Sequence, residues 1–354
     1  MRSFFGTKCF VYVWCKINEF NCDNNNYSTK TTTSKIINDN SIVQVAVQNA
    51  DIAALWDGST LNAGFIVVRP SPLSQQLYRM VREITTKKRR IDDQRALNKA
   101  ARNMKKQGFR VNFLDRNQFF SGKNYFERSF PMLCNTSKTS NKSTCPLVVH
   151  NNWIVGKEAK IYRFREHLMW LYDGVDQYYS SDTRKYLAYE NPNPTTSRYK
   201  FISKKVTESE LSALKTALTI GHLLNRVVIL PKFHCRSRYG YRQCPLNSFI
   251  HMTTFDFIFS GHYRESSFLQ HPKVPDSVKL DRVDRPFILN ANQTSDVLVS
   301  GTDIMSLFGK LEAKVLNLSY LQRVKIDADD GSVDGEFSGK LQSAFRRCRY
   351  RQLH

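Results

Sequence analysis

The sequence predicts an α/β protein, because strand-like runs with a two-residue period alternate along the chain with amphipathic helical segments. The chain has 354 residues, of which 41% are hydrophobic, so it is long enough for more than one compact core. One small module and a wholly disordered chain are both excluded by these numbers. No stretch reaches the roughly 18 apolar residues of a membrane span, so we expect no membrane anchor within this sequence.

The first half of the chain carries clear signals for both kinds of element. Residues 1–42 combine a short apolar run with an Asn/Ser/Thr-rich tract without periodicity, and we expect them to be disordered. One helix is expected to begin at Pro72 behind the N-cap Ser71, and a second to begin at Asp92 and to end at Gly108. Strands are expected at residues 43–47, 63–69, 109–114 and 146–150.

The second half continues the alternation. Helices are expected at residues 157–172, with Leu168 and Leu171 inward, and from Thr207 to Leu224, where Thr207 and Glu210 have the spacing of a capping box. Strands are expected at residues 227–230 and 296–300. An Asn/Pro-rich segment around residue 194 indicates a boundary. We therefore expect a domain at residues 43–180, a linker at 181–206, and a further α/β region of unknown role at 207–354.

The charge of the chain favours anionic partners. The 53 Lys and Arg residues against 31 Asp and Glu residues give a net charge of +22. Nucleic acid, nucleotide phosphates, acidic glycans and membrane surfaces all fit, and charge alone does not choose among them. Residues 73–110 carry twelve Lys and Arg and three acids, but no aromatic residues interleave with them as in a groove for single-stranded nucleic acid. A solvated helix surface is the simpler interpretation of that stretch.

Two cysteine pairs are close in sequence. Cys134 and Cys145 flank one short polar loop, and Cys235 and Cys244 flank another. Disulfides that close these loops would fit both pairs and would indicate an oxidising compartment. A zinc site is the weaker interpretation, because neither pair has the roughly two-to-four-residue spacing of zinc ligands.

Short polar motifs occur in the first region beside apolar segments. Asn62 and Gly64 precede a strand, where backbone can approach a ligand closely. Asp92, Asp93 and Gln94 gather two carboxylates and an amide at a helix N-terminus, an arrangement that capping alone would also explain.

A third motif follows the strand that ends at His150. The chain there continues through Asn151, Asn152 and Trp153 toward Gly156 and Lys157. A histidine at a strand end is as often a packed structural residue as a ligand.

Taken in this order, the three motifs resemble the nucleotide-diphospho-sugar transferase domain. The second half is similar to the region that follows this domain in plant extensin arabinosyltransferases, on residues 224–233, 244–246 and 264–269. The resemblance covers about residues 43–280 and implies a partial A-type glycosyltransferase domain, which is Rossmann-like, followed by a second α/β region.

The resemblance implies a retaining enzyme that transfers a pentose such as arabinose, or a hexose, from a UDP-sugar to a glycan or glycoprotein acceptor. It also implies Mn²⁺ or another divalent metal at the diphosphate, the Golgi lumen with a type II anchor expected upstream, and no nucleic-acid partner. By motif position the resemblance implies Asp93 and Gln94 as catalytic residues, Asn62, Gly64, Gly156 and Lys157 as substrate-binding residues, and His150 as a metal ligand.

One departure from the family pattern concerns the metal. The family's Asp-x-Asp motif does not occur upstream of Asn62, and the sole such spacing, Asp327 to Asp329, lies near the other end of the chain. Asp51 and Asp57 are candidates for supporting roles. We therefore expect a truncated nucleotide-binding part and weak binding of UDP-sugar. The alternative function is a non-catalytic basic protein that binds nucleic acid or anionic glycan.

Overall fold

The computed structural model divides the chain into two compact units, unit 1 at Met1–Ile154 and unit 2 at Val155–His354. Each unit combines helices with sheets that contain parallel strand pairs, which confirms the predicted α/β class. The residues that the structure describes are 11–13, 49–87, 90–128, 148–191, 203–237, 240–287, 297–319, 321–327, 331 and 333–347.

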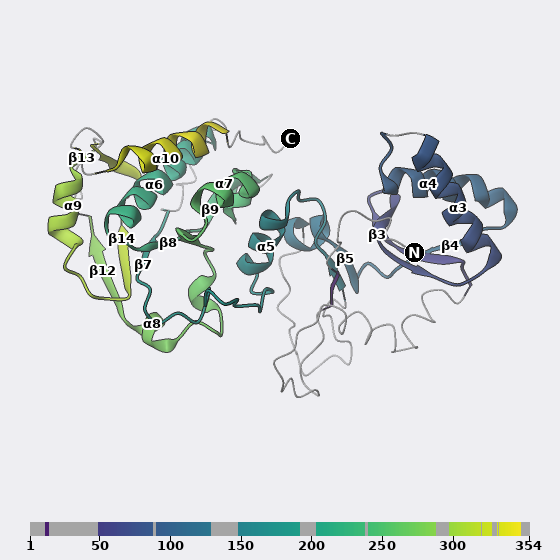
Figure 1. The fold of residues 1–354 in the computed structure, drawn as a ribbon, viewed down its shortest axis with the longest axis horizontal. Coiled ribbons are helices and arrows are strands. Elements are labelled where there is room, and N and C mark those ends of the chain that lie inside the picture. The colour runs from purple at the N-terminus through teal and green to yellow at the C-terminus, as the bar shows by residue number, and fades with distance from the viewer. Residues whose placement is uncertain are drawn as a thin grey trace. The chain divides into compact units, whose positions relative to one another are not determined.

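Unit 1 is built on a three-stranded sheet of order β3-β2-β4, with β2 at Ile52–Asp57, β3 at Thr60–Val68 and β4 at Val111–Phe113. β2 and β3 form an antiparallel hairpin, and β4 pairs with β2 in parallel. Helices α3 (Pro72–Lys87) and α4 (Asp93–Met104) lie side by side in this unit (Figure 1).

Strand β2 is buried on both faces, and its alternating side chains serve two cores. Ile52 and Ala54 pack with the apolar residues of α3 and α4, among them Leu77 and Met104. Ala53 and Leu55 point the other way and pack with Leu114, Phe119 and Val148. Because successive strand side chains alternate between faces, a nearly continuous apolar run is what such a strand requires.

A second small sheet completes unit 1. Its order is β1-β6-β5, with β1 at Val11–Val13, β5 at Phe119–Ser121 and β6 at Val148–His150. β5 and β6 are parallel, and β1 pairs with β6 antiparallel, so β1 is the described part of the segment at residues 1–42. A π-helix at Lys123–Arg128 follows β5.

The helix boundaries of unit 1 confirm the signals in the sequence. Ser71 Oγ accepts a hydrogen bond from the Ser74 N–H at 3.0 Å, and Asp92 Oδ1 accepts one from the Arg95 N–H at 2.7 Å. After α4, a 3-10 turn at Lys105–Gln107 leads to Gly108, whose φ of 85° is the left-handed conformation that ends helices. The strand expected at 43–47 and the pair Cys134 and Cys145 lie outside the described residues.

Unit 2 contains a five-stranded parallel sheet of order β11-β8-β7-β14-β12. Its strands are β7 (Tyr186–Tyr189), β8 (Val227–Ile229), β11 (Tyr263–Arg264), β12 (Arg282–Pro286) and β14 (Val315–Ser319). β9 (Phe233–Ser237) and β10 (Gly240–Cys244) form a hairpin, and β13 (Val297–Val299) pairs in parallel with β15 (Val324–Ile326).

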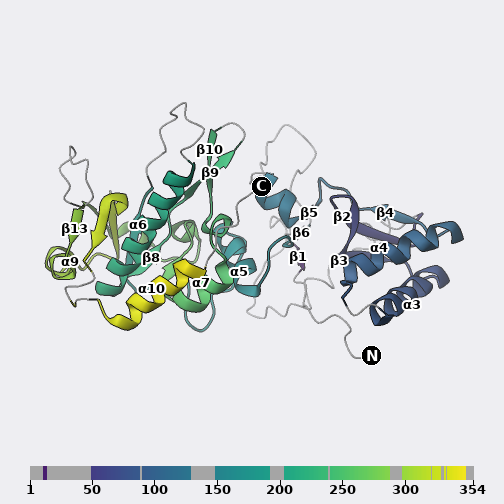
Figure 2. The same ribbon diagram turned by 90° about the horizontal axis from the view of Figure 1, so that it is seen from above.

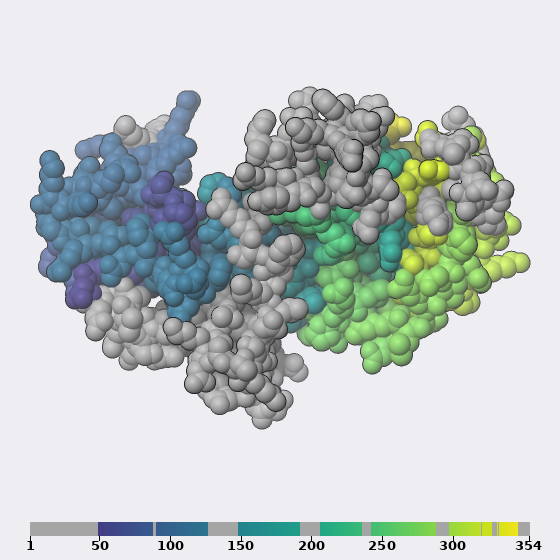
Figure 3. Space-filling model, turned by 180° about the vertical axis from the view of Figure 1, so that it is seen from behind, coloured from purple at the N-terminus to yellow at the C-terminus, as the bar shows by residue number. Residues whose placement is uncertain are grey.

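Unit 2 also contains helices. They are α5 (Lys157–Glu166), α6 (Ser203–Leu223), α7 (Met252–Phe259), α8 (Asp276–Leu280), α9 (Gly301–Phe308) and α10 (Gly335–Arg347), with short 3-10 turns at Leu246–Ser248, Phe268–Gln270 and Leu321–Arg323. α6 packs against β7 and β8 of this sheet. α10 packs against α7 (Figure 2). Figure 3 shows green and yellow-green residues of unit 2 next to one another on one face of that unit. No helix among the described residues is long and apolar enough to cross a bilayer.

Three predictions in unit 2 were wrong in detail. α5 ends at Glu166 rather than at residue 172, because Leu168 adopts a φ of 56°, and Leu171 is exposed. α6 begins at Ser203, so Thr207 and Glu210 do not form a capping box. Glu210 is instead buried within α6 and accepts a hydrogen bond from the His234 backbone N–H at 3.0 Å. Strand β7 also lies within residues 181–206, the segment expected as a linker.

The second predicted disulfide is present. Cys235 and Cys244 are bonded across the β9–β10 hairpin, with their Cα atoms 5.8 Å apart. Both cysteines are buried. This bond confirms one of the two predicted pairs and fits an oxidising compartment.

Candidate functional site

Asp57, at the end of β2, is the centre of a hydrogen-bonded cluster in unit 1. The residue is 8% exposed, and its carboxylate accepts four hydrogen bonds from side-chain N–H groups. Trp153 Nε1 donates to Oδ1 at 2.6 Å, while the amides of Asn62, Asn152 and Gln94 donate to Oδ2 at 3.0, 3.3 and 3.4 Å. All four donors are uncharged. One carboxylate therefore joins β2, β3, α4 and the loop that follows β6.

His150 lies directly against Gly64. His150 ends β6 and is 5% exposed, and a Cβ atom at position 64 would lie 2.5 Å from its Nε2 atom and 2.7 Å from its Cε1 atom. Such distances are far below van der Waals contact, so the imidazole can occupy this position only because residue 64 is glycine. Asn62 Oδ1 accepts a hydrogen bond from the Gly64 N–H at 2.8 Å, which fixes the backbone beneath the ring.

Asn98 attaches α4 to β3. Its Nδ2 donates to the Leu61 carbonyl at 2.8 Å, and its Oδ1 accepts from the Leu61 N–H at 2.9 Å. One turn earlier, Gln94 Oε1 accepts from the Ala63 N–H at 3.4 Å. The register of α4 against β3 is therefore held by side-chain amides at positions 94 and 98.

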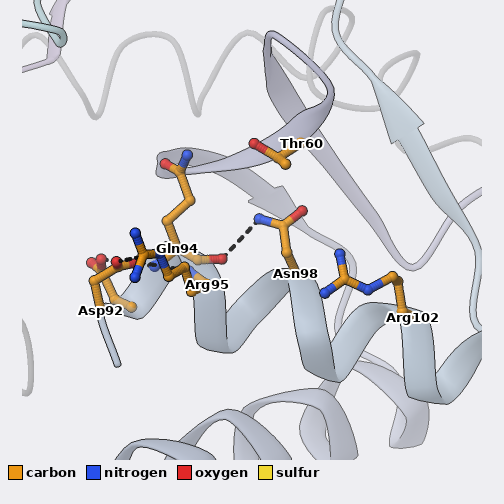
Figure 4. A pocket seen from close by; sticks show the side chains of 7 residues that line it. Thr60, Asp92, Gln94, Arg95, Asn98 and Arg102 are labelled. Atoms are coloured by element: carbon orange, nitrogen blue, oxygen red, sulfur yellow. Dashed lines mark hydrogen bonds and ion pairs between the residues drawn. The ribbon is translucent and has the colours of Figure 1, made fainter. Parts of the chain in front are cut away.

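A pocket of about 520 Å³ runs along α4 beside this cluster (Figure 4). Asp93 lines it from the first turn of the helix, where the residue is exposed and its Oδ1 accepts from the Gln94 N–H at 2.8 Å. The residues that line the pocket are Thr60, Asp92, Asp93, Gln94, Arg95, Asn98 and Arg102.

The predicted site residues of unit 1 are thus brought together. Asn62, Gly64, Gln94 and His150 lie in or against the Asp57 cluster, and Asp93 borders the adjoining pocket.

Gly156 and Lys157 lie near the start of unit 2. Gly156 is the N-cap of α5 with a φ of 97°, and the Thr253 side chain packs so closely that no side chain fits at this position. Lys157 is the first residue of α5. The glycine therefore has a structural reason within unit 2 that sequence reasoning did not supply.

Sequence reasoning missed how central Asp57 is. It treated Asp51 and Asp57 alike, as candidates for support, yet Asp51 only ties strand ends together. Its carboxylate accepts from the Arg110 N–H at 2.9 Å and from Ser71 Oγ at 3.0 Å. A usable signal was present for Asp57, since it ends a buried strand and precedes Gly58, whose φ of 74° makes the hairpin turn. Asn98, Asn152 and Trp153 lie in the recognised motifs but carried no predicted role.

The described residues alone do not assemble a divalent-metal site. No group of three or more His, Cys, Asp or Glu among them is arranged to hold a metal ion. Both oxygens of Asp57 are occupied by N–H donors, so this carboxylate is committed to the cluster. Of the predicted metal site, the described part of unit 1 supplies His150.

This arrangement, an α/β unit with polar side chains gathered where β2 and β6 end, is typical of a domain that binds a polar ligand at strand ends. Residues 19–164 match the model of the nucleotide-diphospho-sugar transferase family. The matched segment is similar to that family and includes every predicted substrate-binding, metal-binding and catalytic residue. No curated protein and no solved structure matches the chain significantly, and the finer similarity to extensin arabinosyltransferases has no support from these comparisons.

Proposed function

We propose that the protein is a glycosyltransferase that moves a sugar from a UDP-sugar to a glycan or glycoprotein acceptor. The observation that carries the proposal is the Asp57 cluster, because it joins the three motifs of the transferase region through side chains of Asn62, Gln94, Asn152 and Trp153. Residues that lie up to 96 positions apart are held in one network. Such positioning is what a site for group transfer requires.

The contacts suggest different tasks for Asp93 and Gln94. The Gln94 amide is engaged at both ends, by Asp57 and by the Ala63 N–H, so it orders the wall of the site. Asp93 is exposed and borders the pocket, where its carboxylate is open to a ligand. We propose that Asp93 stabilises the positive charge that develops on the donor sugar during a retaining transfer, and that Asn62 and Gly64 border that sugar.

The diphosphate end of the donor is the less complete part of the proposal. We propose His150 as a ligand of Mn²⁺ or another divalent metal, and Gly156 with Lys157 as contacts of the diphosphate. A bound metal would offset charge on the leaving diphosphate. Since no group of three or more His, Cys, Asp or Glu among the described residues is arranged to hold a metal ion, no step of transfer is assigned to the metal here.

Finer features of the function are also proposals. A pentose such as arabinose, or a hexose, is the proposed donor sugar. The proposed location is the Golgi lumen, which the Cys235–Cys244 disulfide supports because such bonds persist in oxidising compartments.

The test is binding of UDP, UDP-arabinose and UDP-glucose by the full chain, measured by calorimetry with and without Mn²⁺. We expect weak but measurable binding by the native chain. Asp57→Asn should lose about tenfold in affinity, because the asparagine side chain replaces one acceptor oxygen with an NH2 donor that would face the N–H donors of the cluster. Asp115→Asn, a matched change at an exposed position of the same unit, should leave affinity unchanged. Absence of binding to all three ligands under both conditions would reject the proposed function.

A further inference from the structure

The pocket along α4 has two chemically different ends. Asp92 and Asp93 lie at the start of the helix, and Arg102 lies two turns later. Arg102 lies eight positions after Gln94, which is about 12 Å along a helix. Figure 4 shows Gln94, Asn98 and Arg102 on one side of α4, toward Thr60. The pocket therefore extends from the motif at residues 92–94 to the guanidinium group of Arg102.

Arg102 has no intramolecular partner for its side chain within the described part of the chain. Arg95, by contrast, pairs with Asp92 at 3.2 Å. Asn98 donates hydrogen bonds from Nδ2 to the carbonyl groups of Leu61 and Gln94. Arg102 is exposed, and no acidic residue follows it in α4 or in the turn that continues the helix. An unpaired guanidinium in a pocket wall is suited to a carboxylate or sulfate, which it can bind through two parallel hydrogen bonds.

Further positively charged residues lie next to Arg102 in the sequence. Lys105 and Lys106 follow it and are both exposed, while Lys99 is half-buried. In sequence, residues 73–110 carry twelve Lys and Arg against three acids. The positive field at this end of the pocket is therefore shared by neighbouring residues, and its effect on a polyanion falls as salt is raised.

We propose that the acceptor is an acidic glycan, whose negatively charged residues bind along α4 at Arg102, Lys105 and Lys106. This inference rests on the proposed function, since it takes the pocket beside Asp93 as the place where donor and acceptor meet. A glycan is favoured over single-stranded nucleic acid because α4 exposes no large hydrophobic or aromatic side chain on which bases could stack.

The test must distinguish an acidic acceptor from the sugar donor, because the diphosphate of the donor is also an anion and could bind Arg102. The lining of the pocket favours the acceptor. It contains neither His150 nor Gly64, which lie against one another. Arg102→Glu should therefore weaken binding of the acidic glycan and leave binding of UDP unchanged.

The experiment uses the full chain and two matched oligosaccharides, an oligogalacturonate and its methyl-esterified, uncharged form, with UDP and a single-stranded oligonucleotide as further probes. We expect the oligogalacturonate to bind more tightly than the ester, and Arg102→Glu to weaken it by about tenfold or more, the loss of one charge-assisted contact. Arg102→Lys should keep most of the affinity. Arg79→Glu makes the same charge change on the exposed face of α3, outside the pocket, and should have little effect.

Three results would overturn the inference. One is equal binding of the charged and esterified oligosaccharides, and another is a similar loss for Arg79→Glu and Arg102→Glu. The third is tighter binding of the oligonucleotide than of the oligogalacturonate, or a loss of UDP affinity in Arg102→Glu equal to the loss of oligogalacturonate affinity. Either result would assign Arg102 to a different ligand. Failure of UDP-sugar binding with intact, Arg102-dependent oligogalacturonate binding would instead reject the transferase proposal and leave an acidic-glycan site.

Discussion

Two buried carboxylates, Asp57 in unit 1 and Glu166 in unit 2, have different kinds of partner. In unit 1 the Asp57 carboxylate is surrounded by four neutral N–H donors. In unit 2 the buried carboxylate of Glu166 meets a cation, because its Oε1 accepts from Lys232 Nζ at 2.6 Å. Neutral donors stabilise a carboxylate and leave its charge uncompensated, whereas an ion pair cancels the charge locally. The difference suggests that Asp57 serves a site and Glu166 serves the fold.

Other buried ionisable residues of unit 2 also lie in close contact with one another. Glu210 and His234 are both buried and lie 2.5 Å apart. The Tyr178 ring lies between the guanidinium groups of Arg165 and Arg264, 3.5 and 4.0 Å from its centre, and its hydroxyl donates to Glu265 at 2.7 Å. These contacts connect α5, which carries Arg165, and α6, which carries Glu210, to residues of β9 and β11.

The largest effect on stability is expected from Glu166→Ala. Besides Lys232, this carboxylate accepts from the Ser266 N–H at 3.0 Å and from Ser266 Oγ at 2.6 Å. Its removal leaves those groups without an acceptor and should lower the free energy of unfolding of unit 2 by about 3 kcal/mol. Urea denaturation measures the change. Glu312→Ala, which removes an exposed ion pair with Lys185, is the control and should leave the midpoint unchanged. Equal midpoints for the two variants would contradict the assigned role of Glu166.

The next effect concerns the disulfide of unit 2. Replacing both Cys235 and Cys244 by serine opens a loop with a sequence separation of 9 residues. The loss of that constraint on the unfolded chain should cost about 2.5 kcal/mol. Reductant should lower the denaturation midpoint of unit 2 in the native chain and have no effect on the midpoint of unit 2 in the double variant. A midpoint in the double variant as high as that of the oxidised native chain would show that the bond does not stabilise unit 2.

In unit 1, Gly64→Ala tests the close contact with His150. The added methyl group would displace the imidazole, and we expect a cost of about 2 kcal/mol together with loss of UDP-sugar binding. Gly58→Ala serves as the control for the loss of a glycine, since its Cβ would meet nothing within 4 Å. That variant should be destabilised by its positive φ of 74° but should keep the ligand. If Gly64→Ala binds UDP-sugar normally, His150 does not contribute to the site.

The sequence predicted elements well where local chemistry decides them. Ser71, Asp92 and Gly108 marked helix ends because capping depends on neighbouring residues. Glu210 was misread because its long-range partner, His234, outweighs a capping pattern, and periodicity could not show that Leu168 would adopt a left-handed conformation.

The site was predictable only in its parts. The motifs identified Asn62, Gln94 and His150, since residue type and order are visible in a sequence. The role of Asp57 was not, because it depends on side chains from four separate segments meeting one carboxylate. The spacing between Asp57 and Trp153 in the sequence does not predict their hydrogen bond.

The smallest expected effect is a difference in pH dependence between the units. Burial opposes ionisation of Asp51, but hydrogen bonds from the Arg110 N–H, Ser71 and Arg69 prevail and hold the pKa of Asp51 below its usual 3.8. Its stabilisation of unit 1 is therefore complete above pH 3.8 and is lost as the pH falls through the lowered pKa. In unit 2, burial raises the pKa of Glu210 above 4.5 despite the hydrogen bonds from His234. The folded state then binds more protons than the unfolded state, so stability falls as the pH rises from 4.5 through the raised pKa.

Variants that cannot titrate separate these two contributions. Asp51→Asn should reduce the loss of stability of unit 1 below pH 3.8. Glu210→Gln should reduce the loss of stability of unit 2 above pH 4.5. Each substitution should remove this contribution to the pH dependence of its own unit and leave that of the other unit in place. Hydrogen exchange of amides in α4 and α6, corrected for the intrinsic effect of pH, measures the units one at a time. A change in α6 on substituting Asp51, or in α4 on substituting Glu210, would show that the two units do not titrate independently.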